Sequence, residues 1–181
     1  MVGTRTYGGQ GWGLCRLDGA TLVQSDGSAT LTLRNLDSFQ KLSKVEVTLD
    51  GRPVDQLNEL ECVNGTVWAN VWRTDRIVAV EVPSGRVTAV VDASDLVADR
   101  SGFGSDDVLN GIAHDPEAGR FLLTGKRRPV LFEVVFEPIP SSCPPGGPKS
   151  GIGREPDQAN RASISSSFQN PASGRSGDTS A

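Results

Sequence analysis

Short runs of alternating apolar and polar residues, separated by turn residues, follow one another along most of the chain. The clearest pair is residues 57–63 and 67–72, because the Asn64-Gly65 sequence between them favours the positive φ angles of a two-residue hairpin turn. This stretch therefore predicts two strands joined by a tight turn. It also carries two tryptophans and an Asn-Glu pair, more than a surface hairpin requires.

The start of this hairpin has counterparts on both sides in the sequence. Aligning Gly-Trp-Gly-Leu, Leu-Asn-Glu-Leu and Leu-Asn-Gly-Ile makes Trp12, Asn58 and Asn110 equivalent, with spacings of 46 (58 − 12) and 52 (110 − 58) residues. Further strands are expected at 21–25, 30–34, 44–49, 76–82, 86–92, 121–124 and 130–136, and one short helical turn at 94–99. The third repeat thus has three strands and the others four. Repeats of this kind are typical of β-propellers.

The composition changes sharply after Phe136. Residues 138–181 contain 7 of the 11 prolines, together with 10 serines and 6 glycines, and their few large apolar residues follow no helical or alternating period. Such a segment buries too little surface to offset the entropy lost on ordering. The sequence predicts an all-β domain over residues 1–137 and a disordered tail over residues 138–181.

Charge and hydropathy exclude two classes of partner. The net charge is −4 and the isoelectric point is near 5.0, so no basic surface for nucleic acid is expected. No apolar run is long enough for a transmembrane helix, and the first residues lack the apolar segment of a signal peptide. The sequence does not indicate the cellular compartment of the protein.

The cysteines and the histidine indicate neither a metal site nor a catalytic triad. Cys15, Cys62 and Cys143 are too few and too widely spaced for a disulfide scaffold or a zinc site. Cys15 and Cys62 lie in strand-like runs, where a free cysteine acts as a small buried apolar residue. The single histidine, His114, has no recognisable Ser or Cys nucleophile near it.

Six segments taken together carry a family resemblance: YGGQGWGL (7–14), LVQSDGS (22–28), LNELE (57–61), VWANVW (67–72), DVLNGIA (107–113) and TGK (124–126). In order and spacing, the chain from about residue 5 to residue 136 resembles the plant and bacterial type of glutaminyl-peptide cyclotransferase. The resemblance implies a partial five-bladed β-propeller of about two and three-quarter blades. It also implies an enzyme that converts the amino-terminal glutamine of a peptide or protein to pyroglutamate and releases ammonia, with no cofactor and no catalytic metal.

Four residues are candidates for substrate binding. Trp12 and Trp72 would form the aromatic walls of a pocket at the central channel, and the alternative is packing between blades. Asn58 would bond the substrate amide or amine, or else a neighbouring strand. Lys126 would act as a donor or electrostatic tuner near the channel mouth, or else be a solvated turn residue.

Cyclisation also needs a carboxyl group that moves a proton from the attacking amine to the leaving ammonia. The family supplies a Glu in a Gly-Glu-Gly-Leu-like turn, and the 181 residues contain no such turn. Glu59 and Glu61 are the carboxylates near the pocket residues, and Glu59 is the remaining catalytic candidate. Strand alternation predicts that both lie on the face opposite to Asn58. In two further departures, Gln10 replaces a usual Glu and Arg128 a usual Trp.

Two functional hypotheses follow. The chain is either a glutaminyl-peptide cyclotransferase, or a non-catalytic propeller remnant or interaction domain that keeps part of that fold. A third repeat of three strands leaves an unpaired strand edge, and open edges of this kind promote self-association.

Overall fold

The computed structural model describes residues 3–97, 104, 106–138 and 161–165. Their regular structure is almost entirely β-strand, which confirms the all-β class, and the described helix is one 3-10 turn, Ser94–Val97 (η1), where a helical turn was expected. No helix in these residues is long and apolar enough to cross a membrane. The strands are Leu14–Arg16 (β1), Thr21–Gln24 (β2), Thr30–Asn35 (β3), Lys41–Glu46 (β4), Thr48–Leu49 (β5), Arg52–Pro53 (β6), Leu57–Val63 (β7), Thr66–Val71 (β8), Arg76–Glu81 (β9), Val87–Asp92 (β10), Leu109–Asp115 (β11), Arg120–Gly125 (β12), Leu131–Pro138 (β13) and Arg161–Ser165 (β14).

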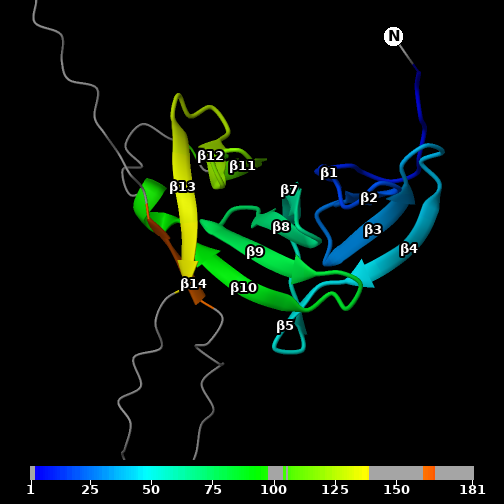
Figure 1. Cartoon of the computed structure of the whole chain (residues 1–181), viewed down its shortest axis with the longest axis horizontal. Helices are drawn as coiled ribbons and strands as arrows, with labels where there is room; N and C mark the ends of the chain where they lie inside the picture. The colour runs from blue at the N-terminus through cyan, green and yellow to red at the C-terminus, as the bar shows by residue number, and fades with distance from the viewer. Residues whose placement is uncertain (1–2, 98–103, 105, 139–160, 166–181) are drawn as a thin grey trace, which may run out of the picture.

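These strands form three successive units of antiparallel strands (Figure 1). The first unit is β1–β4, the second is β7–β10 and the third is β11–β13 with β14. Their first strands lie near one another, because β7 contacts both β1 and β11. The short β5–β6 hairpin, which the sequence did not predict as a separate element, projects between the first and second units.

The turn chemistry of the predicted hairpin is confirmed. Asn64 and Gly65 have φ angles of 50° and 79°, the left-handed values that a type I′ turn requires, and Val63 pairs directly with Thr66. The turn fixes the register of β7 and β8, so that Leu60 lies opposite Ala69 and Cys62 opposite Val67 on the face that packs against the first unit.

Two apolar layers hold the units together. The first junction lies between the first and second units and consists of Cys15, Val23, Leu31, Val47, Leu57, Leu60, Val67, Ala69, Val78, Val80 and Val87. The second junction lies between the second and third units and consists of Ile77, Val91, Ala93, Leu109, Ile112, Phe121, Leu123, Phe132 and Val134, with Trp68 and Phe136 packed against it. Each unit buries side chains by the two-residue alternation of its strands.

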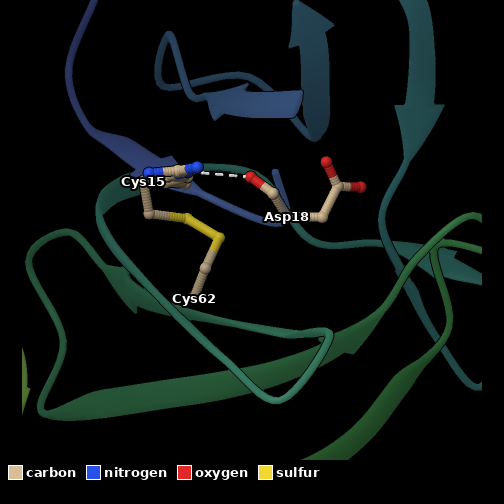
Figure 2. The surroundings of a disulfide bond; sticks show 4 residues. Cys15, Asp18 and Cys62 are labelled. Carbon is tan, nitrogen blue, oxygen red and sulfur yellow. Dashed lines mark hydrogen bonds between the residues drawn. A yellow bond between two sulfur atoms is a disulfide. The ribbon is translucent and has the colours of Figure 1, made fainter. Parts of the chain in front are cut away.

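The structure contradicts the expectation of free cysteines. Cys15 and Cys62 form a disulfide between β1 and β7, with a Cα–Cα distance of 5.5 Å (Figure 2). Their sequence separation of 47 is close to the spacing of the first two repeats, so they occupy neighbouring places in adjacent first strands. Counting cysteines did not reveal this, because the pairing depends on which strands the repeats bring side by side.

The third unit also differs from its prediction. Instead of ending at three strands, it gains β14, which is antiparallel to β13 and parallel to β10. This strand is held by backbone pairing on both sides, which composition does not reveal. The rest of the predicted disordered tail, residues 139–160 and 166–181, lies outside the described residues.

Candidate functional site

One edge of the molecule collects most of the predicted site residues. In each unit the first and second strands are antiparallel, so the start of the first strand lies beside the end of the second. Trp12 precedes β1, Asn58 is the second residue of β7, Trp72 follows β8 and Lys126 follows β12. We call this edge the rim, which comprises residues 10–13, 25–27, 56–59, 72 and 126.

The two tryptophans of the rim are in contact. Their ring centroids are 5.4 Å apart and the planes meet at 81°, the edge-to-face geometry that aromatic pairs favour. The indole Nε1 of Trp12 donates a hydrogen bond of 2.8 Å to Gln10 Oε1, and the guanidinium of Arg73 lies 4.3 Å from the ring centroid of Trp72. Both rings are half-buried, so each keeps an accessible surface.

Gly27 and Gln56 support this aromatic pair. A Cβ on Gly27 would lie 2.6 Å from the Trp12 ring, so only glycine allows the ring to lie there. Gln56 has a φ of 61°, its N–H donates to Gly27 O at 2.8 Å, and its carbonyl accepts from Trp72 N at 2.8 Å. The sequence analysis identified neither role. The Asp26-Gly27 pair is a turn signal that could have pointed to Gly27, whereas no sequence signal points to Gln56.

A β-bulge at Asn58 and Glu59 sets the geometry of the third rim segment. The register shifts between Leu57, opposite Val71, and Leu60, opposite Ala69, so both leucines face the first junction although they are three residues apart. Strict alternation therefore does not hold from Leu57 to Leu60, and the separation of Asn58 and Glu59 onto opposite faces stays a prediction. Asn58 is 5% exposed, whereas Glu59 is half-buried.

The bulge is clamped to the first unit. Ser25 Oγ donates to Asn58 O at 2.5 Å and accepts from Gly13 N at 2.8 Å. A Cβ on Gly13 would lie 2.2 Å from the carbonyl oxygen of Asn58. The backbones of the first and second units therefore approach so closely at the rim that only glycine fits.

Glu59 and Trp12 line one cavity of about 330 Å³. Burial raises the pKa of Glu59, while the N–H of Leu60 and the nearby ammonium of Lys126 act in the opposite direction. Burial also raises the pKa of Glu61, against the effects of His114 and the N–H of Cys62. A carboxyl with a raised pKa holds its proton closer to neutral pH, which suits a group that both takes and gives a proton.

The structure thus brings Trp12, Trp72, Glu59 and Lys126 together and places Asn58 beside them in the chain. Asn110, the third member of the repeat, is half-buried, and its Oδ1 has no hydrogen-bond partner within the described part of the chain. Across residues 3–97, 104, 106–138 and 161–165, no three His, Cys, Asp or Glu residues are grouped closely enough to hold a metal ion.

Comparison with known proteins settles the family. The family model of glutamine cyclotransferase matches residues 1–136. The chain belongs to this family. A curated relative, the glutaminyl-peptide cyclotransferase of Arabidopsis thaliana, is 40% identical over 129 residues, which cover 70% of this chain and 40% of the relative.

The structural comparison agrees with the sequence comparison. The crystal structure of glutaminyl cyclase from Myxococcus xanthus matches with a TM-score of 0.67 and 44% identity, covering 70% of this chain and 55% of that one. Both comparisons confirm the resemblance found in the sequence. This member of the glutamine cyclotransferase family spans 40% to 55% of the length of these two relatives.

Proposed function

We propose that the three units are consecutive blades of a five-bladed propeller and that the rim binds the amino-terminal glutamine of a peptide for cyclisation to pyroglutamate. The observation that carries this proposal is the convergence of Trp12, Trp72, Glu59 and Lys126 on one rim, with Trp12 and Glu59 in a common cavity. Family membership supplies the reaction type, since the relatives named above are glutaminyl cyclases.

The reaction forms one C–N bond and breaks another. The neutral α-amine attacks the carbonyl carbon of the γ-amide, loses a proton, and closes the five-membered ring; the amide nitrogen gains a proton and leaves as ammonia. The step is intramolecular, so holding the chain in a ring-closing conformation provides much of the catalysis. The half-buried faces of Trp12 and Trp72 suit this positioning role.

Glu59 is the proposed proton carrier. Its carboxylate accepts the proton of the attacking amine and returns it to the departing nitrogen, so its protonation state is the same before and after the reaction. The ammonium of Lys126 stabilises the negative charge that develops on the carbonyl oxygen. Asn58 bonds the amide group of the substrate, next to Glu59 in the same bulge.

The test is a mass-spectrometric assay of the purified chain with a short peptide that begins with glutamine. We expect conversion above the spontaneous background, with loss of ammonia, and a loss of that conversion of about a hundredfold or more in Glu59→Gln. Trp72→Ala is expected to abolish peptide binding measured by tryptophan fluorescence. The matched control is Glu117→Gln, in the exposed turn between β11 and β12.

The second candidate is an interaction domain without activity. It is favoured by the exposed large apolar side chains of the described residues, which lie in or beside the first and third units. A folded chain that binds the glutamine peptide but does not convert it would establish a binding module, and Glu59 would then have no catalytic role.

A further inference from the structure

The tip of the β7–β8 hairpin carries an acceptor signal for N-linked glycosylation. Asn64, Gly65 and Thr66 match Asn-X-Ser/Thr, and no other asparagine of the 181 residues has Ser or Thr two positions later. The turn by itself explains the first two residues, because a type I′ turn favours Asn-Gly. It does not explain the third, since Thr66 follows the turn and is the first residue of β8.

The fold leaves this signal accessible. Asn64 and Gly65 are exposed, and a Cβ built on Gly65 meets nothing within 4 Å. Thr66 is half-buried, and its hydroxyl has no hydrogen-bond partner within the described part of the chain. A glycan is bulky and hydrophilic, so the asparagine that carries it must lie on the surface. Asn64 meets this requirement, and the hydroxyl that the signal requires is not engaged elsewhere.

The surface around the hairpin tip is polar. Thr66 is the register partner of Glu81 at the end of β9. The carboxylate of Glu81 accepts hydrogen bonds from Ser84 Oγ at 2.9 Å and from the Arg86 guanidinium at 3.1 Å. Among the described residues, none of the exposed large apolar side chains lies in the second unit. A hydrophilic glycan at this tip therefore covers no apolar surface that another contact would need.

The hairpin tip lies at the opposite end of β7 and β8 from the rim. β7 runs from Leu57 at the rim to Val63, and β8 returns from Thr66 to Val71, next to Trp72. A glycan at the tip therefore leaves the rim open to a peptide. The acceptor site does not depend on the function proposed for the rim.

The disulfide provides an independent observation that points to the same environment. Cys62 lies two residues before Asn64 and is joined to Cys15 of β1. Disulfides form and persist in oxidising environments, such as the lumen of the endoplasmic reticulum, and are rare in the reducing cytosol. N-linked glycosylation is likewise a modification of secreted proteins. One hairpin thus combines two features of a protein that passes through an oxidising, secretory compartment.

We propose that Asn64 is an acceptor site for an N-linked glycan. The donor is an oligosaccharide linked to a lipid through a diphosphate. A bond forms between Asn64 Nδ2 and the anomeric carbon of the first sugar, and the bond between that carbon and the diphosphate oxygen breaks. The amide nitrogen loses one proton, and the lipid diphosphate leaves with the electron pair of the broken bond. Thr66 Oγ1 is recognised by the transferase and stays unmodified.

The test directs the 181-residue chain into the secretory route of a eukaryotic cell with a removable leader and measures the intact mass of the secreted protein. We expect a mass above the 19.1 kDa of the chain, and an N-glycosidase should remove the added mass and leave a carboxyl group at residue 64. Thr66→Val keeps the shape of the side chain and the Asn64-Gly65 turn but removes the hydroxyl, so this added mass should disappear. Thr66→Ser restores the hydroxyl and should restore the added mass.

The matched control is Thr48→Val, which changes another half-buried threonine of a strand and should keep the glycan. Peptide mapping without reductant detects the Cys15–Cys62 disulfide and so shows that the secreted molecules are folded. A disulfide-bonded protein whose mass the N-glycosidase leaves unchanged would overturn the proposal, as would a removable glycan that persists in Asn64→Gln. Peptide conversion is not measured here, so a failure of the function proposed for the rim leaves this result intact.

Discussion

The two junctions hold neighbouring units together through different interactions. At the first junction the side chains are aliphatic, and a disulfide joins the first strands of the two units. At the second junction, Phe121 and Phe136 stack with centroids 4.3 Å apart, and Trp68 lies 4.8 Å from Phe136 and 5.2 Å from Phe121. There β14 also joins the two units into one continuous sheet.

The difference shows where each junction gains its stability. A disulfide acts mainly on the unfolded chain, by restricting its conformations, so its contribution depends on oxidation. Aromatic packing acts in the folded state through buried area and ring geometry, and is independent of redox conditions. The first junction should therefore respond to reductant and the second to truncation of its rings.

The largest expected effect is at the second junction. Phe121→Ala removes a buried ring that contacts Trp68, Phe136 and His114, and we expect a loss of about 3–5 kcal/mol in the free energy of unfolding. Urea unfolding followed by circular dichroism measures this. Phe39→Ala, outside both junctions, is the matched control; an equal loss there would mean that the second junction has no special role.

The disulfide gives the next effect. The Cys15→Ala/Cys62→Ala variant should lose about 2–4 kcal/mol of unfolding free energy, because the cross-link between residues 47 apart no longer restricts the unfolded chain. Reductant should shift the urea midpoint of the natural chain toward that of the variant and leave the variant unaffected. If reductant has no effect on the natural chain, the two junctions do not differ in the way described.

A smaller effect is expected where the two units meet at the rim. Gly13→Ala places a methyl group against the carbonyl of Asn58 and should destabilise the fold by about 1–3 kcal/mol, with weaker peptide binding at the rim. Gly19→Ala meets nothing within 4 Å and is the control. Equal thermal midpoints for the two variants would show that the close approach at Gly13 is unimportant.

The smallest effect is a dependence on pH. The pKa values of Glu59 and Glu61 are raised, so between their unfolded and folded pKa values the folded chain holds more protons than the unfolded chain. Their contribution to stability is therefore full below the unfolded pKa and lost as pH rises through the folded pKa. Glu59→Gln and Glu61→Gln should each weaken this loss of stability with rising pH, which is measured as the urea midpoint of unfolding over a series of pH values.

Asp18 provides the opposite case for the same series. The N–H of Ala20 lowers its pKa, so its contribution is present above the unfolded pKa and lost as pH falls through the folded pKa. Asp18 therefore makes stability rise with pH, and Asp18→Asn should remove that rise. If Glu59→Gln and Asp18→Asn change the slope of stability against pH in the same direction, the opposite pKa shifts of these two carboxyl groups are contradicted.

Much of the fold followed from local patterns. The Asn64-Gly65 turn, the strands on either side of it and the helical turn at Ser94–Val97 were all predicted, because turn residues and alternation act over a few residues. The predicted strand at 44–49 is divided between β4 and β5. The residue between the two strands, Val47, is fully buried in the first junction, and no local pattern specifies that contact.

By itself, the sequence determined the repeats, the all-β class and the family, and it supplied the candidates Trp12, Asn58, Trp72 and Lys126, because spacing and residue type are linear properties. The tertiary structure decided the rest. The bulge at Asn58 and Glu59, the Cys15–Cys62 disulfide and the pairing of β14 with both β10 and β13 all depend on which distant strands become neighbours. That choice is made by burial of the two junctions, a property of the whole chain and not of any segment.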